Sequence, residues 1–373
     1  MTTHVQTAAI IQTAPANHGN ETYSALVWRR LKRSGTGMAG LVLVCMLMLV
    51  TVFAEFFSPV DPKLTGVAFA PPQTISITDQ EGSIVWPRTY TIGESTELDP
   101  VTFQPLVGPD YANPLDLGFF VRGFSYRLFG LIPTERHFFG ATNGTPVNFL
   151  GTDKFGRDVL SRIFHGARVS LMIALTVVFI VTVVGTTVGM VSGYFGGRFD
   201  TWMQRFVDLV LAFPQLPLYL ALTSLIPVTA PTNVFLAFVI FVMSALGWAQ
   251  MSREVRGKTL ALARIDYVRA AMAIGATDRR IIFQHILPNV MSYVIVSVTL
   301  AIPSVVLLES FLGFLGFAVK PPLMSWGLML QDTSTYSVIG SYPWILSPVA
   351  FVLITVFAFN ALGDGLRDAV DPY

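Results

Sequence analysis

The feature that most restricts how this chain can fold is a series of long apolar runs. They lie at about 38–57, 168–193, 207–227, 234–252, 289–311 and 343–363. A helix of roughly 20 apolar residues crosses the hydrocarbon of a bilayer. Because lipid offers no hydrogen-bond partners, the backbone of such runs satisfies its N–H and C=O groups within helices. We therefore expect an all-α membrane protein with about six transmembrane helices.

The composition agrees with this expectation and excludes several other classes. Charged residues make up 13% of the chain, against roughly 25% in soluble domains. The net charge of +1 argues against nucleic-acid binding, which normally needs a basic surface. Cys45 is the single cysteine, so an intrachain disulfide and a cysteine metal cluster are excluded. The five histidines have no metal-ligand spacing, and we predict no metal site.

The distribution of lysine and arginine predicts the orientation in the membrane, because short cytoplasmic loops are enriched in both. The segment before the first run is basic, whereas the loop at 228–233 has no basic residue and the loop at 312–342 has only Lys320. The loop at 253–288 holds Arg253, Arg256, Lys258, Arg264, Arg269, Arg279 and Arg280. We expect both termini and this loop to be cytoplasmic.

The predicted spans and their orientation divide the chain into four regions. Residues 1–24 are polar and predict a disordered cytoplasmic tail, and 25–58 form a basic amphipathic segment and the first span. Residues 59–149 then lie outside the cytoplasm, and 150–373 hold the other five spans with the loop at 253–288. In the insert at 59–149, alternation at 74–78 and 84–86 around a turn predicts a β-hairpin in a small β-containing cap.

Glycine and proline predict how the spans pack and bend. Gly185, Gly189 and Gly193 recur at four-residue spacing, so one helix face is smooth and a neighbouring backbone can approach closely. Prolines within the later spans predict kinks, which suit a moving pathway but also occur in static bundles. These residues are Pro214, Pro217, Pro303 and Pro348.

The loop at 253–288 has its own helical pattern. Apolar residues at three- and four-residue spacing predict a helix with one apolar stripe; they are Leu260, Ala263, Tyr267, Ala270 or Ala271, and Ile274. Gly275 is expected to end that helix and Thr277 to cap a second one. The apolar face needs a cover, and both the membrane surface and a groove in a soluble protein would provide one.

Residues 266–277 (DYVRAAMAIGAT) and 285–289 (HILPN) resemble the EAA loop in permease subunits of ABC importers. Arg269 and His285 stand where the family pattern has Glu and Ile. The resemblance implies a coupling helix that docks into a cleft of an ATPase subunit. The residues it assigns to coupling are Asp266, Tyr267, Arg269, Ala270, Ala271, Gly275 and Ala276.

Further motifs are similar to those of the C-type permease of peptide, opine and nickel importers. They are 150–162 (LGTDKFGRDVLSR), 166–171 (GARVSL), 309–316 (ESFLGFLG), Pro321-Pro322 with 325–327 (SWG), and 362–368 (LGDGLRD). The resemblance covers the first span and 150–373. It implies the type I ABC importer permease fold, with an insert between helices 1 and 2 that is longer than in common dipeptide members.

The same resemblance implies the partners and the place of the protein. We expect a bacterial inner membrane, a homologous second permease in a heterodimer, two ATP-binding subunits and an extracytoplasmic solute-binding protein. Short peptides are the expected solute, with opines, oligosaccharides, murein peptides and nickel chelates as alternatives. The aromatic residues of the insert would either contact the solute or its binding protein, or form the core of the insert or an interfacial belt.

No catalytic site is expected in this chain. Gly257-Lys258-Thr259 imitates the end of a phosphate-binding loop, but Ser252 stands where that loop needs glycine. ATP and Mg²⁺ would bind to the partner subunits, and this chain would hold no cofactor.

Four charged residues are candidates for the pathway or a gate. Glu309 lies near the outer end of the fifth span, where an ionisable group is costly. It would either attract a peptide amine or make a structural contact. Asp153, Arg157 and Asp158 would form either a gate network or a capped surface turn.

Two other classes of protein stay open. A secondary transporter would need acidic residues at mid-membrane, and only Glu309 and Asp208 come near that depth. A structural or signalling membrane protein would need no helix matched to an ATPase.

Overall fold

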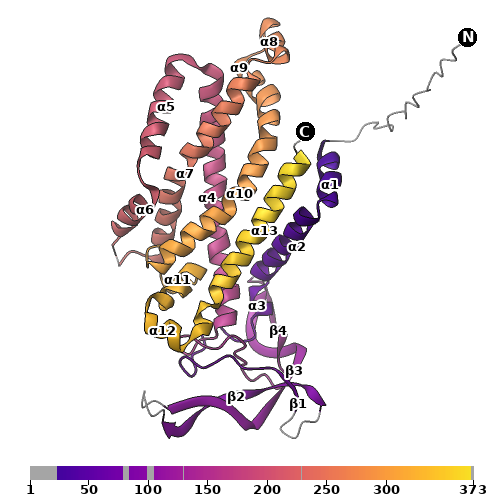
Figure 1. Cartoon of the computed structure of the whole chain (residues 1–373), viewed down its shortest axis with the longest axis vertical. Helices are drawn as coiled ribbons and strands as arrows, with labels where there is room; N and C mark the ends of the chain where they lie inside the picture. Colours follow the sequence, from indigo (N-terminus) through magenta and orange to yellow (C-terminus); the bar gives the residue numbers. More distant parts are fainter. Residues whose placement is uncertain (1–22, 79–83, 99–104, 129, 228, 371–373) are drawn as a thin grey trace, which may run out of the picture.

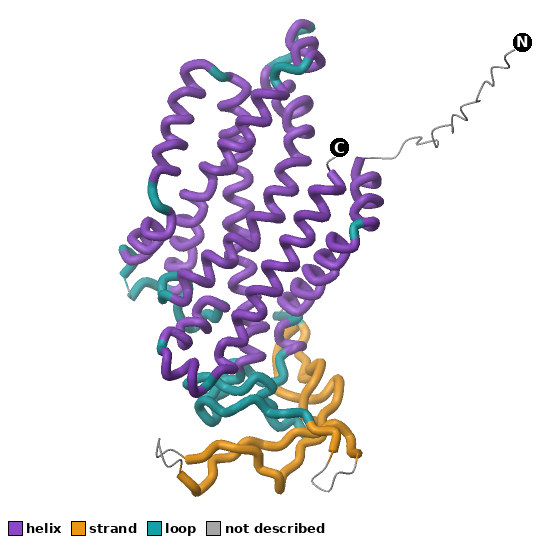
Figure 2. The backbone as a smooth tube through the Cα atoms, viewed as in Figure 1, coloured by secondary structure: helices purple, strands orange, loops and turns teal. Residues whose placement is uncertain are grey.

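The computed structural model describes residues 23–78, 84–98, 105–128, 130–227 and 229–370. Long helices form a bundle, and an antiparallel β-sheet lies at one end of it (Figures 1 and 2). The short helix α8 (Asp266–Ala273) lies at the opposite end, where the first and last described helices also terminate. We call these the sheet end and the loop end.

Several helices of the described chain are long and apolar. Five of them are long enough to cross a membrane, or six if one bent pair is counted as a span, which confirms the predicted helical fold. In chain order the helices are α1 (Tyr23–Arg33), α2 (Gly35–Val52), α3 (Ala54–Phe57), α4 (Val159–Phe195), α5 (Gly197–Ala212), α6 (Gln215–Ser224), α7 (Thr232–Leu262), α8, α9 (Asp278–Arg280), the π-helical η1 (Ile281–Ile286), α10 (Leu287–Phe314), α11 (Trp326–Leu330), the 3-10 turn η2 (Gln331–Ser334), α12 (Tyr336–Ser341), the 3-10 turn η3 (Pro343–Leu346) and α13 (Ser347–Val370).

The start of the chain differs slightly from the expected tail. Helix α1 begins at Tyr23, so Tyr23 and Ser24 belong to a helix rather than to the tail expected at 1–24. Residues 1–22 lie outside the described residues. Helix α1 runs beside the end of α13 (Figure 1), and the Arg30 guanidinium donates to the Ala369 carbonyl at 3.5 Å.

The third predicted span, 207–227, is not one straight helix. Helices α5 and α6 meet at an angle of 81°, with Phe213 and Pro214 between them. Proline has no N–H to donate and its ring clashes with the preceding turn, so the helix stops there. Pro303, by contrast, lies inside the continuous helix α10.

The glycine stripe on α4 packs directly against α7, as its spacing predicted. A Cβ on Gly185 would lie 2.7 Å from the Met251 Cβ, and one on Gly189 would lie 2.6 Å from the Ser252 carbonyl oxygen. At Gly193 the nearest atom would be the Arg256 carbonyl oxygen, at 2.9 Å. Real Cβ atoms do not come this close, so the separation of α4 and α7 depends on these glycines.

We expect Gly189→Ala to destabilise the protein by about 1–3 kcal/mol, because the added methyl group forces two helix backbones apart. Gly257→Ala in α7 is the matched control. Nothing lies within 4 Å of the Cβ position of Gly257, and alanine favours a helix, so this variant should not be destabilised. Thermal unfolding of the purified protein in detergent measures both. Equal stability of the two variants would contradict this account of the packing.

The sheet consists of four antiparallel strands in the order β1-β2-β3-β4. They are β1 (Ser76–Thr78), β2 (Ile84–Leu98), β3 (Pro105–Leu128) and β4 (Ile132–Ala141). The expected hairpin is present, because Thr78 is the register partner of Ile84. Its turn lies outside the described residues.

Aromatic side chains join the sheet to the bundle. The rings of Phe57 in α3 and Phe138 in β4 are 5.3 Å apart, and Phe119 in β3 is 5.5 Å from Phe138. Close by, the His137 ring nitrogen Nδ1 lies 3.0 Å from the Glu55 carbonyl oxygen. Phe119 and Phe138 of the insert therefore pack where the sheet meets α3.

Candidate functional site

Helix α8 is connected to the bundle by tight turns. Helix α7 ends at Leu262, and the Ile265 N–H donates to the Leu262 carbonyl at 3.1 Å before α8 begins. At the other end, Gly275 has φ +86°, which glycine adopts without a steric cost. The Ala276 N–H donates to the Ala271 carbonyl at 3.0 Å, which is the bond of a Schellman cap. Gly275 thus ends the helix as predicted.

The second helix of the loop begins as expected. The Thr277 hydroxyl accepts the Arg280 N–H and caps α9, which continues through η1 into α10. The π-helical geometry of η1 is rare and widens the helix for one turn.

The expected single stripe from Leu260 to Ile274 is wrong. Helix α7 ends at Leu262 and α8 begins at Asp266, so the residues of the stripe belong to two separate helices. Val268 and Ala271 point inward, and Val268 packs against Ile281 and Ile282. Ile274 is 87% exposed at the tip.

The residues assigned to coupling therefore divide into two groups. Ala271 is buried and Ala276 is partly buried, so both hold the loop together. The outward group consists of Asp266, Tyr267, Arg269, Ala270 and Gly275. The sequence pattern missed Met272, which is also exposed and apolar.

Tyr267 is held in place by the start of α10. The Asn289 amide donates to the Tyr267 hydroxyl at 3.1 Å and to the His285 carbonyl at 2.7 Å. The Tyr267 and His285 rings are 6.3 Å apart. The HILPN segment therefore fixes the direction in which α8 projects from the bundle.

Ion pairs between α5 and α7 fix the loop end, and sequence patterns did not single them out. The Arg256 guanidinium binds the Asp200 carboxylate through Nε–Oδ1 at 2.6 Å and Nη2–Oδ2 at 2.5 Å. The Ser192 hydroxyl also donates to Asp200. Arg253 pairs with Asp208 one turn away. Two long helices are thus joined where α7 approaches α8.

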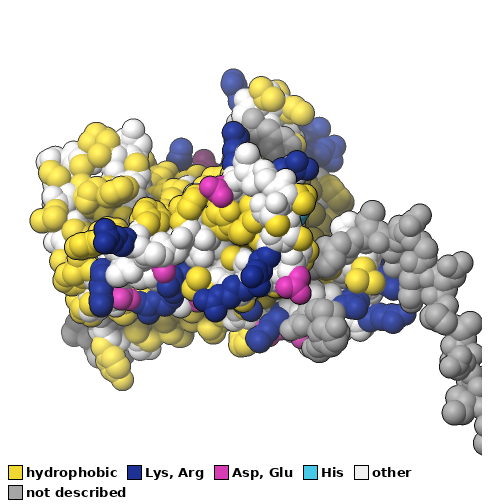
Figure 3. All heavy atoms as spheres, turned by 90° about the horizontal axis from the view of Figure 1, so that it is seen from above, with side chains coloured by type: hydrophobic (Ala, Val, Ile, Leu, Met, Phe, Trp, Pro, Cys, Tyr) yellow, Lys and Arg dark blue, Asp and Glu magenta, His cyan; other side chains and the backbone are white. Residues whose placement is uncertain are grey.

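Basic side chains surround the apolar residues of the loop end. Viewed from that end, Lys and Arg side chains lie over α7–α10 beside exposed hydrophobic atoms (Figure 3). The exposed cations there include Lys258, Arg264, Arg269, Arg279 and Arg280.

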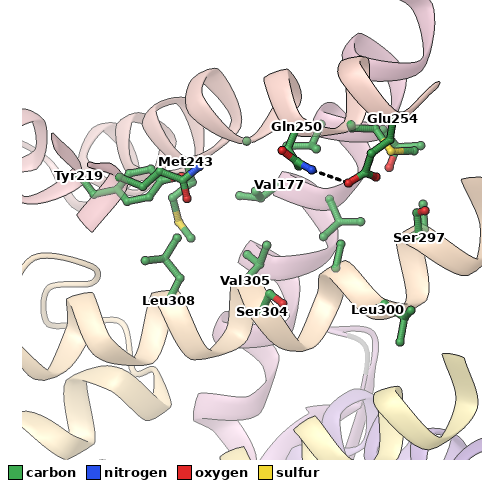
Figure 4. A pocket seen from close by; sticks show the side chains of 18 of the residues that line it. Val177, Tyr219, Met243, Gln250, Glu254, Ser297, Leu300, Ser304, Val305 and Leu308 are labelled. Atoms are coloured by element: carbon green, nitrogen blue, oxygen red, sulfur yellow. Dashed lines mark hydrogen bonds between the residues drawn. The ribbon is translucent and has the colours of Figure 1, made fainter. Parts of the chain in front are cut away.

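A cavity of about 630 Å³ lies between α4, α6, α7 and α10. Figure 4 shows apolar side chains such as Val177, Val305 and Leu308 on its walls and a polar group around Glu254. None of its polar lining residues was singled out from the sequence, because no pattern of spacing relates them to one another. They are Thr182, Gln215, Tyr219, Gln250, Glu254, Tyr293, Ser297 and Ser304.

Glu309 lies away from this cavity. It belongs to α10, and its side chain is completely buried. Its carboxylate accepts a hydrogen bond from the Ser170 hydroxyl of α4 at 2.9 Å. The same hydroxyl accepts the Trp326 N–H at 3.1 Å. Glu309 therefore joins α4, α10 and the start of α11 in the structure.

Asp153 and Arg157 form a closed turn before α4. The Asp153 carboxylate accepts the Phe155 N–H at 2.8 Å and the Arg157 N–H at 3.0 Å. Its Oδ2 lies 2.7 Å from Arg157 Nη2 and also binds the guanidinium of Arg162. Each oxygen of Asp153 is thus occupied, as a structural turn requires.

Asp158 caps the beginning of α4 and is almost completely buried. Its Oδ2 accepts the Ser161 N–H at 2.7 Å, and its Oδ1 has no partner within the described chain. Burial raises the pKa of Asp158 to about 7, although the hydrogen bond from Ser161 opposes this shift. The folded protein consequently binds this proton more tightly than an unfolded chain does.

Because the pKa is raised on folding, Asp158 makes the protein less stable as pH rises from about 4 to about 7. An asparagine side chain caps a helix as well as aspartate does and never ionises. We expect Asp158→Asn to gain melting temperature over the wild type as pH increases from 5 to 8. Thermal unfolding at both pH values measures this, and a pH-independent difference would contradict it.

The described residues contain no group of three or more His, Cys, Asp or Glu side chains that could hold a metal ion. The charged and polar side chains of the loop end and the cavity are suited to hydrogen bonding, ion pairing and packing.

A family model described as "binding-protein-dependent transport system inner membrane component" matches residues 185–373. This chain belongs to that family. A second model, the N-terminal TM domain of oligopeptide transport permease C, matches residues 22–72 of this permease. The family consists of multi-pass inner-membrane permease subunits of ABC transporters, which work with ATPase and solute-binding partners.

Relatives of this permease cover its core and, in one case, its insert. The oligopeptide transport system permease protein OppC of Haemophilus influenzae is 41% identical over 226 residues, which are 60% of this chain and 70% of the relative. The dipeptide transport system permease protein DppC of Bacillus subtilis is 31% identical over 350 residues, which are 94% of this chain and 86% of the relative. The second alignment therefore includes most of the insert at 59–149.

Among solved structures, a chain of the inward-facing MetNI methionine ABC transporter matches this permease with a TM-score of 0.45 and 18% identity. The match covers 55% of this chain and 94% of that chain.

Proposed function

We propose that this permease forms half of the translocation pathway for short peptides in a bacterial ABC importer, beside a homologous second permease. The names of its oligopeptide and dipeptide relatives support peptides as the solute class. The cavity between α4, α6, α7 and α10 supports a pathway, since it combines apolar walls with spaced hydrogen-bonding groups.

In this proposal the loop end faces the cytoplasm and the sheet end faces the solute-binding protein. The exposed Arg and Lys side chains of 253–288 support that orientation, because basic residues are retained on the cytoplasmic side. Both described terminal helices end at the same side (Figure 1).

The observation that carries the proposal is the outward face of α8. Tyr267 and Met272 of this short projecting helix and Ile274, its C-cap residue, have exposed apolar or aromatic side chains, while Val268 and Ala271 are buried on its inner side. Such a helix fits a groove in a soluble partner, which would be an ATP-binding subunit. Two such subunits would bind ATP and Mg²⁺, and this chain would hydrolyse nothing itself.

Movement would pass from the ATPase pair through α8 into the bundle. The Tyr267–Asn289 hydrogen bond connects α8 with α10, and the Asp200–Arg256 pair connects α7 with α5. A displacement of α8 would therefore act on two helices that line the cavity, α7 and α10. This arrangement suits alternating access, in which the cavity opens to one side of the membrane at a time.

The overall test is purification of the tagged protein from membranes in mild detergent. We expect a second permease and an ATPase to accompany it, and the complex to import peptides into proteoliposomes only with ATP and the binding protein. Transport by this chain alone, without ATP, would contradict the proposal and favour a secondary transporter.

A single substitution tests whether the outward face of α8 binds the ATPase. We expect Ile274→Asp to reduce peptide uptake and binding-protein-stimulated ATP hydrolysis by at least about tenfold, because a central apolar contact contributes about 2 kcal/mol or more. Ile274→Met is the matched control and keeps an apolar side chain, so it should retain most activity. Wild-type uptake by Ile274→Asp would show that this face does not transmit the ATPase movement.

A further inference from the structure

One acidic side chain lines the cavity among the described residues. Glu254 comes from α7, near the loop end, and Figure 4 shows it beside Gln250 on the same helix. The other described lining residues are apolar or neutral polar. Glu254 is therefore the one charged residue that the described chain contributes to the cavity lining.

Neighbouring donors hold the Glu254 carboxylate in a defined direction. The Gln250 amide donates to Oε1 at 2.6 Å, and the Tyr293 hydroxyl of α10 donates to Oε2 at 2.7 Å. Each carboxylate oxygen can accept more than one hydrogen bond, so both keep accepting capacity. The carboxylate is thus positioned by one residue of its own helix and one of the facing helix.

Glu254 has no cationic partner in the described part of the chain. No Lys or Arg nitrogen there lies within 4.0 Å of its carboxylate oxygens. Lys258, one turn further along α7, lies instead over the Tyr293 ring, with Nζ 5.2 Å from the ring centroid. Arg253 and Arg256 are engaged by Asp208 and Asp200. No cation of the described chain therefore forms a direct ion pair with Glu254.

A half-buried carboxylate with two fixed donors and no direct ion pair in the described chain is suited to an ammonium group. An ammonium offers three donors and a compensating charge, and charge-assisted hydrogen bonds are stronger than neutral ones. The surrounding surface fits the rest of a peptide, since Gln215 and Ser304 offer hydrogen bonds and the walls are apolar.

We propose that Glu254 binds the α-ammonium group of the peptide within the translocation cavity, and that Gln250 and Tyr293 position its carboxylate. This inference rests on the proposed function as a peptide permease. It assigns to Glu254 the attraction of a peptide amine that the sequence suggested for Glu309, whose carboxylate is buried against Ser170 instead.

The test uses the purified complex of permeases and ATPases without ATP and without the binding protein, so that only the cavity can select. Binding of fluorescently labelled Ala-Ala-Ala-Lys, with the dye on the lysine side chain, is compared with binding of its N-acetylated form. The wild-type complex should bind the free amine about tenfold more tightly, which corresponds to about 1.4 kcal/mol.

Two variants and one control then locate the effect. Glu254→Gln should abolish the preference by weakening only the free-amine peptide. Tyr293→Phe, which keeps the carboxylate but removes one donor, should reduce the preference without abolishing it. Thr299→Val, on α10 but outside the cavity lining, should leave the preference unchanged.

The outcomes separate this inference from the proposed function. Equal binding of the two peptides by the wild-type complex, or an unchanged preference in Glu254→Gln, overturns the role of Glu254 while peptide import still stands. Failure to bind either peptide by a complex that imports peptides also overturns it. A complex that imports no peptide in proteoliposomes overturns the proposed function itself.

Discussion

The close approach of α4 and α7 is the contact on which much of the bundle depends. Gly185, Gly189 and Gly193 leave space where any side chain would collide with the α7 backbone or Met251. In a bilayer, the hydrophobic effect does not drive helices together, so dispersion contacts between closely packed backbones replace it. This contact sets the position of α7, and α7 in turn carries residues of the cavity and leads into α8.

Helix α7 contributes both to the largely apolar cavity and to the ion pairs with α5 at the loop end. Its second half contributes Met243, Gln250 and Glu254 to the cavity, and Arg256 in the same half pairs with Asp200 of α5. A two-point guanidinium–carboxylate bond fixes orientation as well as distance. These cavity residues and Arg256 therefore lie on one continuous helix, which ends at Leu262 before α8 begins.

Several local features were predictable because they depend on residues close in the chain. The cap at Gly275 follows from the conformational freedom of glycine, and the cap at Thr277 follows from its hydroxyl. The hairpin at 74–86 follows from alternation around a turn. The prediction of one apolar stripe from Leu260 to Ile274 was wrong. The spacing of the apolar residues is regular over this segment, but the chain turns after Leu262 and divides it between two helices. The bend at Pro214 was foreseen as a kink, but its 81° angle was not.

The sequence by itself determined that the chain crosses a membrane as helices, since the length of apolar runs and the absence of water in lipid leave no alternative. It also determined the family, through ordered motifs such as those at 150–162 and 266–277. Tertiary structure decided which charges meet. Glu254 faces Tyr293 in a cavity, whereas Glu309 is enclosed beside Ser170, and both are single acids in apolar helices. Their difference lies in the rotation and neighbours of each helix, and these are set by contacts between residues far apart in the chain.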